Sequence, residues 1–384
     1  MTEPLRVLEL LVSTDPGGGP AHVLELVARL PRDEFEVTVA GPGGGAYAGG
    51  LSAGSAGFVD VPANRLSLRA LLAVRRLVRD RRIELVHSHG KGAGLYGRLV
   101  ARRGGIPAIH TFHGIHYARY GPAARLYLAM ERWLAAMSAA IVHVSESQAR
   151  EAGPLGLCPP GRTLVIENGV NAARVRARMQ PRSAARRALG LDAGDLVVGT
   201  IARFDPVKAV DALVAAFARM ARERPSARLA LVGDGSESAR LRALARTLRI
   251  QDRVSFAGGM PEAARLLSAL DVYASASRRE GLPLALLEAM ACGLPVVATR
   301  APGHVDVVAD GDTGVLVAQD DLPALARAMG DLLDDPARRA ALGEAGRRRA
   351  EDRFGVERMA SETAALYRAA AARFPGGRSQ TSGV

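Results

Sequence analysis

Short β-like runs alternate with helical runs along almost all of this 384-residue chain. The alternation comes in two blocks, separated by a Pro- and Arg-rich stretch at residues 172–187. Strands that alternate with helices form parallel sheets covered on both faces. The predicted strands are 5–12, 36–40, 58–61, 83–88, 108–112, 140–145 and 163–166, then 196–203, 228–232, 253–256, 271–275, 295–299 and 314–317. We therefore predict an α/β protein with two Rossmann-like, doubly wound parallel-sheet domains.

The boundaries follow from where the alternation stops and restarts. We expect a first domain at residues 1–172 and a second at 188–350. Residues 351–374 are predicted to form a helix that belongs to the second domain or crosses back to the first. The polar tail at 375–384 is expected to be disordered, and the Gly-rich stretch 41–57 to be a flexible loop. Ligands of such sheets bind at the carboxyl ends of the strands, here in a cleft between domains.

Composition excludes several classes of protein. Apolar residues make up 48% of the chain and aromatic residues only 4%, so the cores must consist of Ala, Leu and Val. Cys158 and Cys292 are too few and too isolated for a disulfide framework or a Cys-based zinc site. No uncharged apolar run reaches about 18 residues, the length that spans a membrane, and the N-terminus does not resemble a signal peptide. We therefore expect a cytoplasmic protein.

The chain is basic, with a net charge of +12. Residues 1–180 hold 22 Lys/Arg and 14 Asp/Glu, so +8 of this excess is N-terminal. Compositional drift in an Ala- and Arg-rich chain explains it as well as attraction to an anionic surface does. Nucleic acid is the weakest candidate partner, because the basic stretches lack interleaved aromatic residues and no DNA-binding pattern appears.

The stretch 274–299 concentrates the chemistry of the second block. It reads as a loop, a short helix, a glycine turn and a buried strand. Glu280 and Glu288 lie eight residues apart, and Pro283 falls where the helix begins, a position that tolerates a missing N–H. A helix start preceded by glycine presents backbone N–H groups that suit phosphate. An anion site beside two carboxylates indicates a nucleotide-sugar, although the pair alone is equally compatible with acid/base catalysis.

Other strand-end segments carry residues suited to ligands. The loop Gly17-Gly18-Gly19 lets backbone approach a ligand closely, although a plain mobile loop is equally consistent with it. Arg203 and Lys208 follow a strand and can clamp a diphosphate; Lys208 is one of only two lysines in the chain. Gly258-Gly259 follows another strand and can contact a base through its backbone.

Five of the eight histidines cluster in the strand-end segments 83–94 and 108–116: His87, His89, His110, His113 and His116. Three interpretations compete. A metal site needs ligands held by an acidic shell, and neither segment contains an acidic residue beside its histidines, so we predict no metal. His87 and His110 fit core or capping positions. His113 ends its strand before Gly114 and fits a role in the ligand cleft.

The predicted helix Leu66–Arg82 is amphipathic, with leucines on one side and six arginines on the other. A solvated helix on the protein surface explains this pattern most simply. Docking of this helix on an anionic membrane is the more specific hypothesis.

Together these motifs resemble the retaining glycosyltransferases of family 4, "glycosyl transferases group 1", which have the two-domain GT-B fold. The string from Ser277 to Thr299 is similar to that family's Glu-x7-Glu motif in its full context. Departures are few: His22 stands where the family often has an acidic residue, and Asp306 where it often has Glu. The first departure leaves the acceptor side open.

The resemblance implies roles at the matching positions. Glu288 would bind the ribose hydroxyls and Glu280 the donor sugar near its 3-hydroxyl. The backbone of Gly281, Leu282 and Pro283 would hold neighbouring groups and phosphate. Arg203 and Lys208 would neutralise the diphosphate, and Gly17–Gly19 would contact phosphate and acceptor. Gly258 and Gly259 would contact the base. His113 would lie beside the reacting sugar.

The resemblance further implies an acceptor-side first domain and a donor-binding second domain. The expected enzyme transfers a hexose-type sugar, with retention and without metal or other cofactor, from a nucleotide diphosphate donor, most simply UDP-linked. The acceptor would be a small molecule or a lipid-linked hydroxyl, as in an envelope glycan, a glycolipid or a natural product. Two alternatives stay open: a GT-B UDP-sugar 2-epimerase or hydrolase, and a non-catalytic nucleotide-sugar-binding or membrane-scaffold protein.

Overall fold

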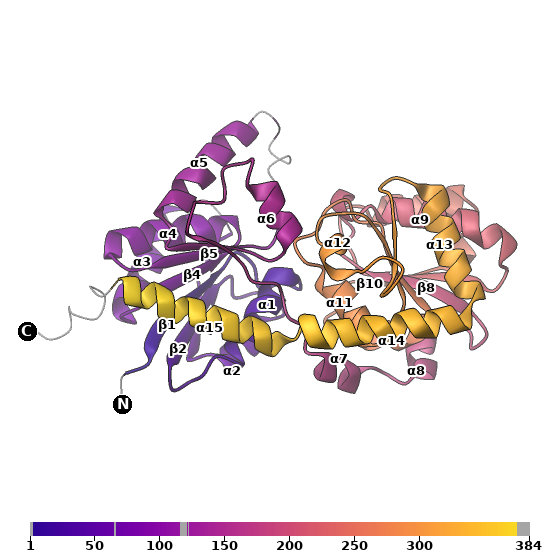
Figure 1. Ribbon diagram of the computed structural model, residues 1–384, viewed down its shortest axis with the longest axis horizontal. Helices are drawn as coiled ribbons and strands as arrows, with labels where there is room; N and C mark the ends of the chain where they lie inside the picture. The colour runs from indigo at the N-terminus through magenta and orange to yellow at the C-terminus, as the bar shows by residue number, and fades with distance from the viewer. Residues whose placement is uncertain (1–2, 65–66, 116–120, 122, 375–384) are drawn as a thin grey trace, which may run out of the picture. The chain divides into compact units, whose positions relative to one another are not determined.

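The computed structural model describes residues 3–64, 67–115, 121 and 123–374. The chain divides into two compact units, residues 1–169 with 356–384 and residues 170–355. The predicted tail at 375–384, together with Leu66 and His116, lies outside the described residues. Each unit is an α/β layer structure with a parallel sheet at its centre, as the alternation predicted (Figure 1).

The first unit contains a seven-stranded parallel sheet in the order β3-β2-β1-β4-β5-β6-β7. Its five central strands are buried almost throughout, which explains their near-continuous apolar sequences, whereas the edge strands β3 and β7 are partly exposed. The strands are β1 (Leu5–Leu11), β2 (Phe35–Gly41), β3 (Gly57–Asp60), β4 (Leu85–His89), β5 (Ala108–Phe112), β6 (Ala140–His143) and β7 (Thr163–Val165). The helices are α1 (Gly18–Val27), α2 (Ala48–Gly54), α3 (Leu68–Asp80), α4 (Lys91–Gly104), α5 (Ala124–Met137), α6 (Glu146–Ala152) and α15 (Val356–Arg373).

The second unit contains a six-stranded parallel sheet in the order β10-β9-β8-β11-β12-β13. The strands are β8 (Leu196–Ile201), β9 (Ala227–Val232), β10 (Val254–Gly258), β11 (Val272–Ser275), β12 (Val296–Thr299) and β13 (Val315–Val317). The α-helices are α7 (Ala172–Arg178), α8 (Arg182–Ala188), α9 (Val210–Met220), α10 (Ser238–Thr247), α11 (Leu284–Ala291), α12 (His304–Val307), α13 (Leu322–Asp334) and α14 (Pro336–Arg353). Short 3-10 helices are Pro206–Lys208, Ala221–Glu223, Gln251–Arg253 and Ala263–Ala269.

Strand order reverses once in each sheet, between β1 and β4 and between β8 and β11. At such a switch point the connections leave the sheet in opposite directions, which opens a crevice outside the carboxyl ends of the two strands. The residues that follow these four strands are therefore the first places to look for a ligand site.

One local expectation was wrong, because the Gly-rich stretch 41–57, expected to be a flexible loop, contains α2, which buries Leu51 completely. The stretch 172–187, which separates the two blocks in the sequence, forms α7 and most of α8 in the second unit. The helix expected at 351–374 is α15, which begins only at Val356, since residues 351–353 are the end of α14.

The break between α14 and α15 lies at Phe354 and Gly355. Phe354 is fully buried, and its carbonyl oxygen accepts a hydrogen bond from Val170 N at 2.7 Å. Beyond the break, α15 packs on the first unit, where Met359 and Tyr367 join the apolar core with β1 and β2. Figure 1 shows α15 in yellow alongside this sheet. The C-terminal helix therefore completes the first unit.

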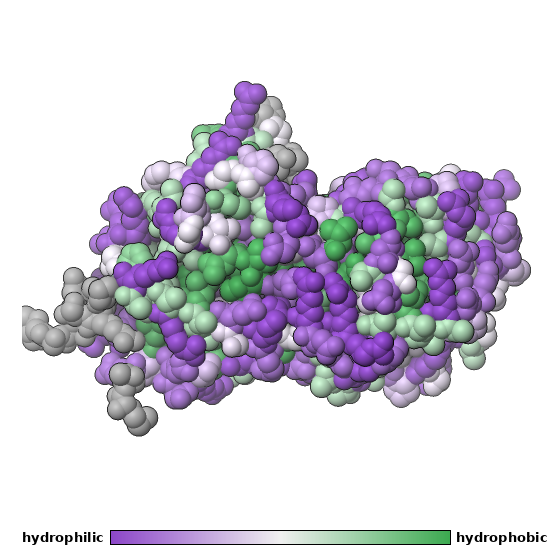
Figure 2. All heavy atoms as spheres, viewed as in Figure 1, coloured by the Kyte–Doolittle hydropathy of each residue, from purple (hydrophilic) through white to green (hydrophobic). Residues whose placement is uncertain are grey.

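The surface carries scattered apolar side chains. Leu68 and Leu72 on α3 are exposed, whereas Val74, Leu77 and Val78 pack into the core. On α5, Leu126 and Trp133 are exposed, and hydrophilic and hydrophobic residues are mixed along this helix (Figure 2). Among the described residues, no helix combines the length and the apolar character that crossing a membrane requires.

Candidate active site

Lys208 and Glu280 meet at the switch point of the second unit. Lys208 ends the 3-10 helix that follows β8, and Glu280 lies in the loop that follows β11. The Lys208 ammonium group contacts both carboxylate oxygens, with Nζ 2.7 Å from Oε1 and 2.6 Å from Oε2. Burial would raise the pKa of Glu280, but Lys208 and His304 lower it below its ordinary value. Two of the predicted site residues thus form a charged pair in which each neutralises the other.

The loop before α12 fixes the position of Glu280. The Glu280 backbone N donates to the Pro302 carbonyl oxygen at 3.0 Å. Gly303 has a φ of +83°, and a Cβ at this position would lie 2.7 Å from the Glu280 Cβ. The Gly303 backbone N in turn donates to the Asp306 carboxylate at 3.1 Å. Glycine is thus required at position 303 by both conformation and space.

Glu288 is placed differently from Glu280. It lies on α11, and burial raises its pKa to about 7, against the opposing influence of Arg174 on α7. Among the described residues, no contact joins Glu288 to Glu280 or Lys208. Its nearly neutral pKa suits a carboxyl group that gains hydrogen bonds when a ligand with hydroxyl groups arrives.

The α11 start can bind an anion. Gly281 and Leu282 are buried, and Pro283 is the N-cap residue, with no side-chain hydrogen bond to the first turn. In the first turn of an uncapped helix, the backbone N–H groups lack partners within the helix and attract a negatively charged ligand.

Arg203 lies apart from the lysine pair. The strand β8 ends at Ile201, so Arg203 is in the following loop, where its side chain is largely exposed and its Nε contacts Asp205 Oδ2 at 2.5 Å. The two predicted diphosphate cations therefore interact with different carboxylates in this structure.

Gly258 ends β10, and Gly259 follows it. Gly258 has a φ of +76°, and its carbonyl oxygen accepts from Gly233 N at 2.9 Å, which ties the loop after β10 to the loop after β9. A Cβ at Gly259 would lie 3.3 Å from the Asp234 Cβ. This places the glycine pair at the carboxyl edge of the sheet, as a base-contacting loop requires.

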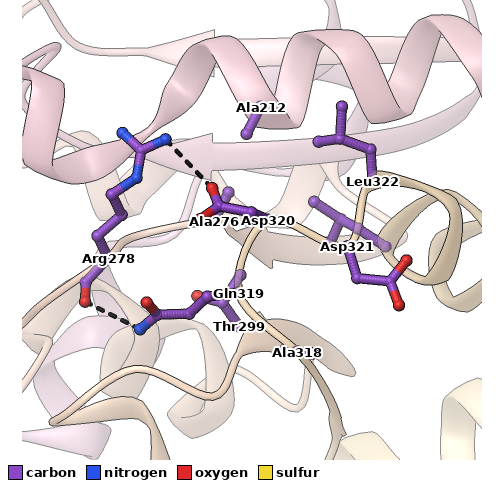
Figure 3. Close-up of a pocket in the computed structure, with 10 residues that line it drawn as sticks. Ala212, Ala276, Arg278, Thr299, Ala318, Gln319, Asp320, Asp321 and Leu322 are labelled. Atoms are coloured by element: carbon purple, nitrogen blue, oxygen red, sulfur yellow. Dashed lines mark hydrogen bonds and ion pairs between the residues drawn. The ribbon is translucent and has the colours of Figure 1, made fainter.

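A small pocket beside this region is lined by residues from α9, β12, α13 and the loops after β11 and β13 (Figure 3). Arg278 Nη2 contacts Asp320 Oδ1 at 3.2 Å, and Gln319 Nε2 donates to the Arg278 carbonyl oxygen at 3.0 Å. None of the predicted site residues lines it. The pocket is therefore not the candidate site.

In the first unit, histidines gather at the switch point between β1 and β4. His89 ends β4, and its Nε2 lies 2.7 Å from the Glu9 carboxylate on β1. On its other side, His89 Nδ1 lies 2.9 Å from His113 Nε2. His22 on α1 completes the group, with ring centroids 5.0 Å from His113, and its Nδ1 lies 3.0 Å from the Asn168 side-chain oxygen.

These histidines are electrically neutral near pH 7. Burial, with the neighbouring His89 and His87, lowers the pKa of His22 to about 3. Burial, with His87, lowers the pKa of His89 to about 4, although Glu9 opposes this shift. Burial and the histidines around it hold the pKa of His113 well below its ordinary value. The group therefore offers hydrogen bonds and carries no positive charge.

The structure brings the glycine loop to this histidine group. A Cβ at Gly19 would lie 3.3 Å from His113 Cδ2, whereas one at Gly18 would meet no atom within 4 Å and one at Gly17 only atoms about 4 Å away. Gly19 is thus the position of this loop at which a side chain would press on the His113 ring. His87 and His110, in contrast, lie buried inside strands, as expected of core histidines.

The histidines do have an acidic partner, contrary to the expectation from the sequence. We excluded a metal because neither histidine segment contains an acidic residue beside its histidines, but Glu9 reaches both His87 and His89 from β1. One nitrogen of each of His22, His89 and His113 lies within 4.8 Å of the others. Because Glu9 supplies an acidic partner, the lack of acidic residues in the two histidine segments is no reason to exclude a cation at this group.

Sequence reasoning also missed Glu9, His22 and Tyr367 as members of this site. Tyr367 on α15 donates to Glu9 Oε1, and its oxygen lies 2.6 Å from His87 Nδ1. One signal was available: Glu9 is an acidic residue inside a strand otherwise buried on both faces, where an unpaired charge is costly. Its partners, His89 and Tyr367, are 80 and 358 residues away and left no local signal.

Comparison with known proteins agrees with this arrangement. The profile "Glycosyltransferase Family 4" matches residues 16–174, and "Glycosyl transferases group 1" matches residues 181–349. The chain is 33% identical over 327 residues to D-inositol 3-phosphate glycosyltransferase of Thermobispora bispora, covering 80% of this chain and 76% of that protein. It is 30% identical over 316 residues to putative glycosyltransferase EpsD of Bacillus subtilis, covering 80% and 82%.

A solved structure shares the fold. The crystal structure of Anabaena Alr3699/HepE in complex with UDP and glucose superposes with a TM-score of 0.84 at 23% identity, over 95% of this chain and 100% of that one. The fold and the sequence similarity together define a glycosyltransferase with the GT-B fold. The chain belongs to glycosyltransferase family 4, the group 1 glycosyltransferases.

Proposed function

We propose that this enzyme transfers a hexose-type sugar, with retention, from a UDP-sugar to a hydroxyl group of an acceptor. The observation that carries the proposal is the contact of Lys208 with Glu280, within the Glu280–Glu288 motif of a family 4 chain. The structural neighbour HepE was solved with UDP and glucose, which supports a UDP-linked donor. Glu288, with its raised pKa, is the proposed ribose ligand.

The chemistry follows from where charge develops. Breaking the bond between the sugar and the diphosphate builds negative charge on the leaving oxygens. Lys208 and the N–H groups at the α11 start supply positive charge there, and Arg203 adds to it by exchanging its contact with Asp205 for the diphosphate, so the proposed reaction needs no metal. As the diphosphate binds, it competes with Glu280 for Lys208. The Glu280 carboxylate is then available to accept a hydrogen bond from a sugar hydroxyl. The acceptor oxygen bonds to the anomeric carbon on the face that the diphosphate leaves, and the leaving phosphate takes the acceptor proton.

The acceptor is proposed by class. The relative in Thermobispora bispora is named for D-inositol 3-phosphate, an anionic polyol. The charge of +8 on residues 1–180 favours an anionic acceptor, whether a phosphorylated polyol or a lipid-linked glycan. A natural-product hydroxyl is the remaining acceptor class to include in a screen.

We place the reaction in the cytoplasm, where two isolated cysteines remain reduced. Peripheral membrane contact through Leu66–Arg82 rests on exposed Leu68 and Leu72 with Arg75, Arg76 and Arg79 on α3. Flotation with anionic liposomes tests this contact, with the triple change of Arg75, Arg76 and Arg79 to Ser as control. Wild-type protein that stays at the bottom of the gradient excludes it.

The activity test combines donor and acceptor panels. Thermal shift with UDP-, GDP- and ADP-sugars identifies the donor, and product analysis with inositol phosphates, lipid-linked glycans and aglycones identifies the acceptor. Glu280→Gln and Lys208→Ala are expected to lower kcat/KM by about 10²-fold or more, since each removes transition-state stabilisation. Arg240→Ala is the matched control, because Arg240 forms exposed ion pairs with Glu237 and Asp211 in the same unit.

The outcomes separate the alternatives. Product formation that Glu280→Gln abolishes, with the control unaffected, supports the transferase. Release of UDP and free sugar without any acceptor identifies an epimerase or hydrolase. Tight donor binding without turnover on every acceptor identifies a non-catalytic binding protein.

A further inference from the structure

A continuous hydrogen-bond path runs through the first unit from Thr111 on β5 to His113, which lies beside the glycine loop. Between these ends it passes in turn through His87, Tyr367, Glu9 and His89. Glu9, His87, His89 and Tyr367 are all buried. A buried path of this kind has few ways to place its protons, because each donor must meet an acceptor.

In the half of the path near α15, an ionised Glu9 fixes the proton of Tyr367 and the proton on His87 Nδ1. Burial would raise the pKa of Glu9, but His87 and His89 hold it well below its ordinary value, so the carboxylate only accepts. Tyr367 gives its single proton to Glu9 Oε1. The Tyr367 oxygen must then accept from His87 Nδ1, at 2.6 Å. His87 Nε2 lies 2.7 Å from the Thr111 hydroxyl, which can act as donor or acceptor, so either charge state of His87 leaves the half of the path beyond Glu9 unchanged.

The half near the glycine loop follows in the same way. Glu9 Oε2 accepts from His89 Nε2 at 2.7 Å, so the single proton of neutral His89 is on that nitrogen. His89 Nδ1 is therefore an acceptor, and His113 Nε2 must donate to it at 2.9 Å. The single proton of neutral His113 is then used, which leaves His113 Nδ1 as a bare acceptor.

His22 also has one ring nitrogen without a proton, because of a separate hydrogen bond. Its Nδ1 donates to the Asn168 side-chain oxygen at 3.0 Å, which leaves Nε2 without a proton. Neither His22 Nε2 nor His113 Nδ1 has a hydrogen-bond partner within the described part of the chain. A buried acceptor without a partner is unfavourable, and a ligand that donates a hydrogen bond can recover the lost free energy. The His113 ring as a whole is only partly buried.

We propose that Glu9 and His89 are positioning residues that keep His113 unprotonated at Nδ1, so that His113 and His22 form a subsite for sugar or acceptor hydroxyl groups. The inference rests on the proposed transferase function and specifies it further. Two neutral acceptors attract hydroxyl donors and offer nothing to a phosphate. The glycine loop beside His113 thus borders a hydroxyl site, whereas the sequence led us to expect a phosphate near it.

Nitrogen NMR of protein labelled with ¹⁵N-histidine tests the proton positions directly. In the wild type, the expected spectrum shows His113 and His89 with the proton on Nε2, and His22 with the proton on Nδ1. Assignment uses single substitutions of each histidine by Gln. A wild-type spectrum with a proton on His113 Nδ1, or with a charged His113 at neutral pH, overturns the proposal.

Glu9→Gln makes the sharpest variant. The new amide has two orientations. With its NH₂ group toward Tyr367, Tyr367 donates to His87 Nδ1 and the wild-type tautomers of His89 and His113 persist, which the ¹⁵N spectrum of the variant would show. With its oxygen toward Tyr367, its NH₂ group faces His89 and donates to Nε2. His89 then carries its proton on Nδ1 and donates to His113, whose proton moves to Nδ1. The acceptor at His113 becomes a donor, and kcat/KM is expected to fall at least about 10-fold, as a wrong tautomer does in other enzymes.

Two controls separate proton position from loss of structure. Tyr367→Phe removes a hydrogen bond from Glu9 but leaves the direction of the His89–His113 bond unchanged, so the His113 tautomer should persist. Glu131→Gln alters another buried carboxylate of the unit, paired with Arg98 at 2.8 Å, and should also leave it unchanged. If Glu9→Gln does not fold, the wild-type and Tyr367→Phe spectra still show which His113 nitrogen carries the proton.

Failure of the inference and failure of the proposed function give different results. Predicted tautomers without sugar transfer on any donor and acceptor pair support the hydroxyl subsite and count against the transferase. Sugar transfer with a protonated His113 Nδ1 supports the transferase and overturns the subsite. Retention of equimolar Zn²⁺, with shifts confined to His22, His89 and His113, identifies the nitrogens as metal ligands and likewise overturns it.

Discussion

The two switch points use their carboxylates in opposite ways. At β1 and β4, Glu9 is buried, and histidine and tyrosine donors satisfy both of its oxygens. At β8 and β11, Glu280 is paired with the flexible ammonium group of Lys208 and keeps some exposure. The first carboxylate organises neutral rings and is unsuited to contact with a ligand. The second can exchange its partner for a ligand.

Under the two proposals above, this difference gives the units different ligands. The neutral acceptors of the first unit would bind hydroxyl groups, while the lysine, the arginine and the helix start of the second unit would bind a diphosphate. The same topology, a reversal of strand order, thus supports two kinds of recognition, because the residues after the strands differ. Substitutions at the two switch points should therefore affect activity and stability in different ways.

The largest effect is expected for Gly303→Ala in the second unit. The new Cβ would lie 2.7 Å from the Glu280 Cβ and 2.9 Å from the Gly281 carbonyl oxygen, so the loop that carries Glu280 must shift. A shift of this size in a positioned group lowers kcat/KM by about 100-fold. Steady-state kinetics with the identified donor measures it.

Gly311→Ala provides the matched control for backbone strain. Gly311 has a φ of +81°, nearly that of Gly303, but a Cβ there would meet no atom within 4 Å. Both variants should lose a similar free energy of unfolding from the positive φ, and only Gly303→Ala should lose activity. Equal activity in the two variants would show that Glu280 does not depend on this loop.

The next effect is expected for Tyr367→Phe in the first unit. The change leaves Glu9 Oε1 and His87 Nδ1 buried without their shared partner, so the free energy of unfolding should fall by about 1–3 kcal/mol. Tyr273→Phe is the counterpart in the second unit: Tyr273 is also buried, but its hydroxyl donates to a backbone carbonyl oxygen, that of Ile201, at 3.2 Å. Urea denaturation should show the larger loss in free energy of unfolding for Tyr367→Phe. A larger loss for Tyr273→Phe would argue against a stabilising hydrogen-bond network at Glu9.

A pH effect is expected at Glu288. With a pKa of about 7, its charged fraction rises from pH 6 to pH 8, and a carboxylate is the better acceptor for two ribose hydroxyls. Donor affinity in the wild type should therefore rise with pH through about 7, by at most about 10-fold over this range. Glu288→Gln should bind more weakly at pH 8 and lose the pH dependence, which calorimetry at three pH values measures.

Stability responds to the same group with the opposite sign. Because folding raises the pKa of Glu288 from 4.5 to about 7, its contribution to stability is full below about 4.5 and is lost as pH rises through 7. Solvent screening of this partly exposed side chain reduces the loss to about 1–2 kcal/mol. A wild-type stability that rises between pH 5 and 7, and does so more steeply than in Glu288→Gln, would contradict the raised pKa.

The sequence predicted the sheets better than the sites. Buried parallel strands carry near-continuous apolar runs, so both strand sets could be located from local pattern, as for Ala108–Phe112. The contact between Lys208 and Glu280 followed only loosely, because both residues were expected at strand ends but not as a pair. The network around Glu9 could not be predicted, since Tyr367 reaches it from a helix that returns after the whole second unit. Local patterns do not encode such distant contacts.

The smallest effect is expected for Gly19→Ala. Both Gly18 and Gly19 lie in the first turn of α1, where alanine is the better helix former by up to about 1 kcal/mol. At Gly18 a Cβ would meet no atom within 4 Å, whereas at Gly19 it would lie 3.3 Å from His113 Cδ2. Gly18→Ala should therefore keep wild-type activity with equal or higher stability.

Gly19→Ala should push the His113 ring by a few tenths of an ångström. It should lower kcat by about two- to five-fold, because positioning contributes modestly when the displacement is small. Equal kcat values in the two variants, measured with saturating donor, would show that the glycine loop does not fix His113, and would limit the comparison between the two switch points to Glu9 and Glu280 alone.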